Sequence, residues 1–156
     1  DTDALYNLQS SRELQEISDD EEQFVDLASS VQILVDEHVI KDGPVLMDGV
    51  KNIELVRRKQ GMEVDVFQHH WREVHGPLGA SIKQVSRYVQ NHAKASSYLN
   101  GRLPKLDGLA LTWFKDVDAM RESAQSEEYQ VTCNDEENFL TIPVDFIIAQ
   151  EHTLAG

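Results

Sequence analysis

The sequence predicts an α+β protein in which one antiparallel β-sheet carries helices on one face. Residues 50–154 contain strand and helix patterns in the order strand, helix, strand, strand, helix, strand. Residues 1–40 resemble residues 116–154, so the pattern of the last helix and strand occurs twice. A hydrophobic fraction of 40% with 27% charged residues is typical of a soluble globular protein.

The internal repeat rests on two aligned stretches. Asp1–Phe24 aligns with Asp116–Phe139, and both stretches contain the block Asp-Glu-Glu-x-Phe. After a slip of one residue, Val31–Ile40 aligns with Asp145–Leu154, and both contain a Glu-His pair. Self-similarity at a long period reports on architecture, so we interpret the two stretches as copies of one structural element.

The repeat divides the chain into three parts. We expect residues 1–40 to be the back half of a first unit, residues 41–49 a linker, and residues 50–154 a complete unit. Within the first part, Thr2–Gln9 is predicted to be a helix and Val31–His38 a strand. A helix and a strand cannot bury a core alone. We therefore expect them to pack against the complete unit, or to complete its sheet with help from another chain.

The complete unit is predicted to alternate strands with helices and loops. The strands are expected at Asn52–Lys59, Lys83–His92, Leu106–Phe114 and Pro143–Glu151. The helices are expected at Glu63–His75 and from Asp116, a good N-cap residue, to about Gln125. Loops are expected at Ser96–Pro104 and in a short acidic turn through Asn138. Gly76-Pro77 is expected to end the first helix, because proline cannot continue one.

This order of elements predicts a ferredoxin-like unit, because two βαβ-type halves form an antiparallel sheet with helices on one face. The other face of the sheet would be bare. Such units are stabilised when two sheets pack together, so a second sheet is expected from a tandem copy or a second chain.

Composition excludes several classes of protein. A formal net charge of −14 argues against nucleic-acid binding, which needs clustered Lys and Arg. No apolar run is long enough to cross a membrane, and the first residues lack the features of a signal peptide. The single cysteine, Cys133, fits a reducing compartment and is expected to be an unreactive thiol. We therefore expect an acidic cytoplasmic protein.

Four motifs occur in a fixed order along the second part of the chain. They are F-x-x-x-W-R-E-x-H-G-P-L from Phe67, R-Y-V-Q-N-H from Arg87, D-G followed by W-F from Asp107, and D-E-x-x-F from Asp135. Over about Val50–Leu154 this set closely resembles the EthD family of dimeric α/β-barrel proteins.

The resemblance implies a ferredoxin-like unit whose sheet closes against a partner sheet, with a pocket between sheet and helices. Family members from degradation gene clusters include small enzymes that act on lactones and polyketides by isomerisation, cyclisation, dehydration or decarboxylation. They need no cofactor, and no metal or cofactor is expected here. The resemblance also implies pocket positions for His75 and Tyr88, as the acid/base group and the hydrogen-bond donor.

The residues themselves support a site near the first helix. His75 follows an apolar helix face, and imidazole titrates near neutrality, so it could move a proton in either direction. Tyr88 and His92 share one strand face, where they could donate to a developing oxyanion or orient a carbonyl group. The other candidate substrate-binding residues are Gln90, Trp113, Trp71 and Phe67. Trp113 and Phe114 point to opposite faces, so one of them could line an apolar pocket.

Each of these assignments has a structural alternative. His75 could be a cation that satisfies carbonyl groups at a helix C-terminus. Trp71 and Phe67 fit the core, and His69 falls on the solvent side of the helix. His38 and His152 are not expected to bind metal, because no third ligand stands at a suitable spacing. The acidic blocks Asp20–Glu22 and Asp135–Glu137 resemble solvated turns.

The leading functional hypothesis is a cofactor-independent enzyme of the EthD type that performs proton-transfer chemistry on a small apolar carbonyl or lactone compound. One alternative is a non-catalytic ligand-binding or assembly module on the same barrel. Another is a haem-dependent or cofactor-free monooxygenase, which would place a histidine beside a cavity wide enough for a macrocycle.

Overall fold

A computed structural model describes residues 11–152, which belong to two compact units divided between Gln32 and Ile33. The first unit contains helix α2 (Arg12–Glu21), which begins at Ser11, whose side-chain oxygen accepts a hydrogen bond from the Leu14 amide at 3.1 Å. The predicted helix Thr2–Gln9 lies outside the described residues. Within residues 11–152, the helices are too short and too polar to cross a bilayer.

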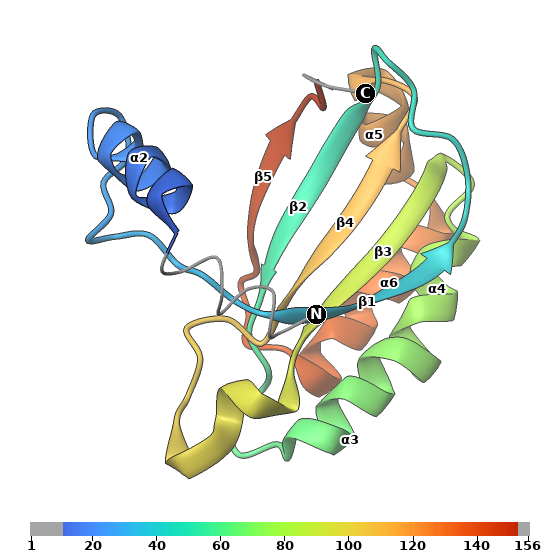
Figure 1. Cartoon of the computed structure of the whole chain (residues 1–156). Helices are drawn as coiled ribbons and strands as arrows, with labels where there is room; N and C mark the ends of the chain where they lie inside the picture. Colours follow the sequence, from blue (N-terminus) through green and yellow to red (C-terminus); the bar gives the residue numbers. More distant parts are fainter. Residues whose placement is uncertain (1–10, 153–156) are drawn as a thin grey trace. The chain divides into compact units, whose positions relative to one another are not determined.

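The second unit is a five-stranded antiparallel sheet with its helices on one face (Figure 1). The strands are β1 (Val35–Lys41), β2 (Val50–Val56), β3 (Val85–Ala93), β4 (Gly108–Phe114) and β5 (Asp145–Ala149), in the spatial order β1-β3-β4-β2-β5. The helices are α3 (Val64–His69), α4 (Gly76–Ser81), α5 (Val117–Ser123) and α6 (Glu127–Phe139). Strands β2 to β5 and their helices have the ferredoxin-like order, which confirms the predicted fold class.

Strand β1 adds a fifth strand to this unit by pairing with the outer edge of β3, where Val35 faces Ala93 and His38 faces Gln90. It begins at Val35, later than the predicted strand Val31–His38. The tandem organisation of the chain stays a prediction.

The prediction that Gly76-Pro77 ends the first helix is wrong. Helix α3 continues through a π-helical turn, His70–His75, directly into α4. In this widened turn the Gly76 amide donates to the Trp71 carbonyl, five residues back. Pro77 therefore occupies the first turn of α4, where its missing N–H group needs no acceptor.

The predicted acidic turn through Asn138 is also wrong, because most of that segment is helix α6. Ser126 caps the helix by accepting a hydrogen bond from the Tyr129 amide at 3.1 Å. A serine followed by two glutamates is a signal for a helix start that the sequence contains. The predicted loop Ser96–Pro104 likewise contains a short 3-10 helix, Ala95–Gly101.

The core lies between the sheet and the long first helix. Phe67 and Trp71 are fully buried, as is Phe139 from α6, and the Phe67 ring centroid lies 5.5 Å from that of Trp71 and 6.0 Å from that of Phe139. The Trp71 ring stacks on the His92 ring at 4.3 Å, with an angle of 6° between the planes. These contacts fix the first helix on β3 and β4.

Gly108, at the start of β4, allows the Trp71 ring to approach the sheet. A β-carbon at this position would lie 2.3 Å from the Asn91 carbonyl oxygen and 2.7 Å from the Trp71 ring. Neither the strand backbone nor the buried indole can move away cheaply. We therefore expect Gly108→Ala to lower the free energy of unfolding by about 1–3 kcal/mol, measured by urea denaturation.

The matched control is Gly76→Ala, where the nearest atom, a methyl carbon of Ile40, lies 3.2 Å from an added β-carbon. This side chain can shift, so the control is expected to change stability by less than about 1 kcal/mol. Equal losses in the two variants would contradict the proposed role of Gly108.

Candidate functional site

A small cavity of about 50 Å³ lies between the helix-covered face of the sheet and helix α6. Its polar lining comes from β2, β3 and β4, from the π-helical turn and from α6. The polar residues are Asn52, Glu54, His75, Tyr88, Thr112, Tyr129, Thr132, Cys133 and Glu136. The predicted site residues His75 and Tyr88 therefore lie on one cavity.

His75 is held by Asp135, the first residue of the D-E-x-x-F motif, for which the sequence predicted a solvated turn and no role in the site. Its Nδ1 atom lies 3.1 Å from Asp135 Oδ2, and His70 Nε2 lies 3.0 Å from Asp135 Oδ1. Burial lowers the pKa of His75, and the hydrogen bond to Asp135 opposes that shift. A hydrogen on Nδ1 directed at Asp135 leaves Nε2 of the neutral ring able to accept a proton.

Asp135 stays ionised in this position. Its own burial disfavours the charged form, but hydrogen bonds from Asn138, His70 and His75 outweigh that effect and hold the pKa of Asp135 below its ordinary value. The interpretation of Asp135–Glu137 as a solvated turn is therefore wrong. The alternative for His75 as a helix C-terminal cation is also wrong, because the helix continues past it.

Tyr88 reaches the cavity from β3 and is almost fully buried. Its hydroxyl oxygen accepts a hydrogen bond from Gln90 Nε2 at 2.9 Å, and its ring packs closely on Gly79. Burial raises the pKa of Tyr88, so the phenol keeps its proton at neutral pH. Because Gln90 supplies a hydrogen to the oxygen, the hydrogen of the phenol itself can be donated to a ligand.

Four of the predicted substrate-binding residues lie in the core instead of on the cavity wall. Gln90 donates to the Trp71 carbonyl at 2.8 Å, and its Oε1 lies 3.0 Å from His92 Nε2. Burial, followed by the charges of His38 and Arg72, lowers the pKa of His92 to about 3, so this ring is neutral. Phe67 and Trp71 are buried in the core, which agrees with the alternative prediction that they are core residues and do not bind substrate.

Trp113 lies on the opposite face of the sheet. Its Nε1 atom donates to Glu151 Oε2 at 3.3 Å, and Lys51 Nζ lies 5.0 Å from the centroid of its ring. Phe114, the next residue, lines the cavity beside His75. Of these two aromatic residues, Phe114 is the one that faces the candidate site.

Two carboxylic acids on the cavity wall were missed by sequence reasoning. Glu54 comes from β2 and Glu136 from α6. Desolvation raises the pKa of Glu54 to about 7. A hydrogen bond from Asn52 Nδ2, at 2.9 Å, acts in the opposite direction and lowers it in part. Desolvation, with repulsion from Glu54 and Asp135, also raises the pKa of Glu136 to about 7. Both groups can therefore exchange protons near neutral pH.

Two larger cavities share Glu54 and Tyr129 with the small one. One, of about 240 Å³, lies toward α5 and is lined by apolar residues that include Phe114, Met120, Phe146 and Ile148. The other, of about 270 Å³, lies toward the start of β5 and includes Cys133, Glu136 and Val144. Burial raises the pKa of Cys133, in agreement with an unreactive thiol.

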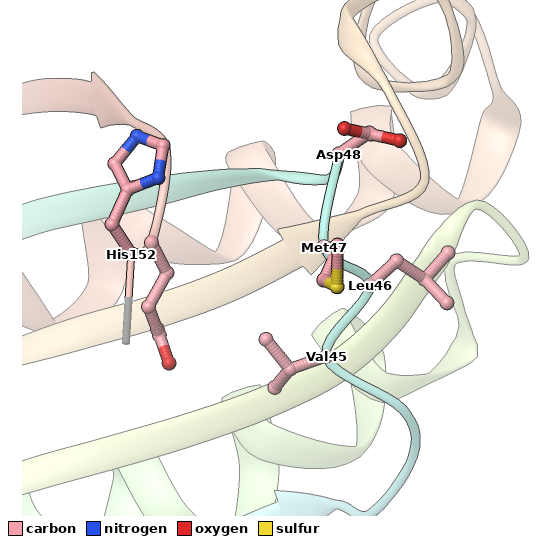
Figure 2. A pocket seen from close by; sticks show the side chains of 6 residues that line it. Val45, Leu46, Met47, Asp48 and His152 are labelled. Carbon is pink, nitrogen blue, oxygen red and sulfur yellow. The ribbon is translucent and has the colours of Figure 1, made fainter. Parts of the chain in front are cut away.

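A separate, open hollow of about 530 Å³ lies where the segment before β2 meets the end of the described chain (Figure 2). It is lined by Val45, Leu46, Met47, Asp48, Glu151 and His152. Glu151 is already paired with Lys51, whose Nζ lies 2.5 Å from its carboxylate. No group of three or more His, Cys, Asp or Glu side chains suited to a metal ion occurs within residues 11–152.

Comparison with known proteins agrees with this fold. The family model described as "EthD domain" matches residues 59–143, which is more than half of the chain. A search of curated proteins gives no match. An EthD family protein from Bacillus halodurans is a similar solved structure: its TM-score is 0.55 at 18% identity, with 67% of this chain and 99% of that chain covered.

Two dimeric ferredoxin-like proteins of unknown function are similar at lower identity. The protein from Bacteroides fragilis has a TM-score of 0.51 at 14% identity, covering 67% of this chain and 97% of that one. The protein from Thermobifida fusca has the same TM-score and identity, covering 66% and 91%. Similarity at this level reports the fold alone, whereas the match to the family model assigns the family. The chain belongs to the EthD family.

Proposed function

We propose that the protein is a cofactor-independent enzyme that moves protons on a small, largely apolar carbonyl or lactone compound. His75 is the acid/base group and Tyr88 the hydrogen-bond donor. The observation that carries this proposal is the pairing of His75 Nδ1 with Asp135 on a cavity that Tyr88 also lines.

The chemistry follows from the protonation states of these two groups. Neutral His75 can take a proton from the carbon next to a carbonyl group, and Asp135 stabilises the imidazolium that forms. As charge develops on the carbonyl oxygen, the Tyr88 hydroxyl can donate a hydrogen bond to it. Isomerisation, cyclisation and dehydration can all begin with such a step. Decarboxylation begins with loss of CO2 instead, and it leaves an enolate that the same donor can stabilise.

A second candidate function is a non-catalytic ligand-binding module. It is favoured by the volume beside His75 and Tyr88, which at about 50 Å³ holds only a few water molecules. A catalytic ligand would therefore occupy one of the larger cavities and extend past Tyr129 toward His75. The same volume is too small for a macrocycle, so the residues do not fit a haem at His75.

The role of His75 can be tested by its titration. In NMR spectra of the imidazole groups, we expect His75 to titrate below 6.5, and at still lower pH in Asp135→Asn, because the carboxylate stabilises the charged ring. Asp118→Asn, an exposed aspartate on α5, is the control and is expected to leave this titration unchanged. A His75 that titrates like a free histidine and is indifferent to added γ-butyrolactone would contradict the proposed role.

Proton transfer by His75 and Tyr88 can be tested directly. We expect the wild-type protein to exchange the α-protons of cyclopentanone in D₂O, measured by the loss of their NMR signal. His75→Gln should slow this exchange by about 100-fold, since general bases contribute on that order. Tyr88→Phe should also slow it by about 100-fold or more, because the oxyanion loses one donor. Binding of the ketone with no exchange above the buffer rate would favour the non-catalytic module.

We also propose that a second EthD-like sheet covers the face opposite the helices. That face carries half-buried apolar residues, among them Ile53 and Leu55 on β2 and Leu111 on β4, together with the more exposed Ile147 on β5. Within residues 33–152 the helices lie on the other face (Figure 1). An uncovered apolar face of this kind marks an interaction surface.

The division into a partial first unit (residues 1–40), a linker (41–49) and a complete unit (50–154) belongs to the same proposal. It is supported by α2 and α6, because the aligned residues Ser11 and Ser126 cap these helices in the same way. It is also supported by β1, whose sequence aligns with the end of the chain and which pairs with the edge of β3.

Assembly through the apolar sheet face can be tested by mutation. We expect the protein to self-associate through this face at micromolar concentration, and Ile147→Glu to shift it to the monomer, because a buried charge without a partner is costly. The mass in solution can be measured by light scattering after size-exclusion chromatography. Val131→Glu, on the exposed side of α6, is the matched control and should leave the mass unchanged. A wild-type monomer at every concentration would contradict self-association.

A further inference from the structure

Glu54 and Glu136 reach the same space from opposite sides. Glu54 projects from the central part of the sheet and Glu136 from helix α6, and both line the cavities of about 50 Å³ and about 270 Å³. Glu54 also lines the third cavity, of about 240 Å³. A ligand in any of the three spaces would therefore contact Glu54.

The polar groups that line the two cavities shared by this pair include no positively charged side chain. Tyr88 faces it from β3, and His75, which is neutral, from the π-helical turn. Helix α6 contributes Tyr129, Cys133 and Glu137, and β5 places the apolar Phe146 opposite Glu54. No Lys or Arg lines the two cavities that the carboxyl groups share. Arg121 lines only the third cavity, and it is paired with Asp118.

Two carboxylates in such a place cannot both be ionised without a large electrostatic cost. The pair is therefore expected to hold one proton at neutral pH and to titrate as a coupled unit. The Asn52 amide donates to Glu54 Oε1, which fixes the orientation of that carboxyl group on a rigid strand. Glu136 lies across the cavity, on helix α6, and its charge can change how tightly Glu54 holds its proton.

We propose that Glu54 is a catalytic residue of this site, that Glu136 is a positioning residue for its proton, and that the ligand is an uncharged carbonyl compound. This inference rests on the proposed function of His75 and Tyr88. An anionic ligand is excluded from the two shared cavities, because it would add a second negative charge beside the ionised carboxylate of the pair, and no Lys or Arg lines them.

The reaction that this arrangement serves is an isomerisation. His75 Nε2 takes a proton from the carbon between a carbonyl group and a carbon–carbon double bond, and the electron pair of that C–H bond passes into a dienolate. Tyr88 donates a hydrogen bond to the dienolate oxygen. Protonated Glu54 then gives its proton to the distal carbon, where the new C–H bond forms. His75 returns its proton to Glu54 through solvent, so the product is an isomer and no oxidant or reductant is used.

The kinetic test uses cyclohex-3-en-1-one as the probe, whose conversion to cyclohex-2-en-1-one is followed by the absorbance of the conjugated enone. We expect Glu54→Gln to slow this conversion by about 100-fold or more, because the proton donor is lost. Glu127→Gln, an exposed glutamate on the same helix as Glu136, is the control and should retain the wild-type rate.

The pH dependence of the rate in Glu136→Gln distinguishes a positioning residue from one that only stabilises the fold. Without the second carboxylate, Glu54 should lose its proton at lower pH. The alkaline limb of the rate profile should therefore move down by more than about one pH unit. In wild-type protein labelled with ¹³C at the glutamate carboxyl carbons, NMR should show two carboxyl groups that titrate together near neutral pH. This measurement needs no variant.

The outcomes separate the two proposals. If the wild-type protein exchanges α-protons and Glu54→Gln isomerises the probe at the wild-type rate, this inference is overturned and the proposed function stands. If both carboxyl groups titrate independently near their ordinary value, the inference is overturned as well. If the wild-type protein exchanges no α-protons, the proposed function itself fails.

Discussion

The contact between Trp71 and the sheet is the constraint on which the rest of the site depends. The indole ring stacks on His92 and approaches the sheet over Gly108, so the first helix has one position on β3 and β4. The carbonyl of the same residue accepts hydrogen bonds from both Gly76 and Gln90. The first of these widens the helix into a π turn, and the second orients the amide that bonds to Tyr88. One residue thereby places both His75 and Tyr88 on the same cavity.

Local patterns in the sequence predict the strands well and the helices less well. Alternation of apolar residues predicts the ends of β2 to β5 to within a few residues. This works because side chains alternate between the two faces of a strand, so the pattern depends on the strand alone. The first helix continues beyond Gly76-Pro77 because a tertiary contact at Trp71 favours the widened turn, and no local rule includes that contact. Helix α6 is missed because few of its residues reach the core: Thr132 and Phe139 are buried, and the rest are largely polar.

The candidate site is only partly predictable for a related reason. His75, Tyr88 and Asp135 all belong to motifs that the sequence displays. The pairing of Asp135 with His75 cannot be predicted from them, because it forms only when α6 packs on the π turn. Glu54 was hidden by the ordinary expectation that polar residues of a strand face solvent. In β2 that order is reversed, with Asn52 and Glu54 on the face that the helices cover and Ile53 on the other.

The reversed polarity of β2 connects the chemistry to the assembly. A carboxylic acid directed toward the helices is tolerated because a cavity lies there and Asn52 donates a hydrogen bond to it. Ile53 and Leu55, directed the other way, are half-buried, and a second sheet would remove their remaining contact with water. Because side chains alternate strictly along a strand, a slip of one residue in the pairing of β2 would exchange these two sets. The same register therefore determines which face of β2 carries Glu54 and which face is available to a partner sheet. Selection on either face constrains the other.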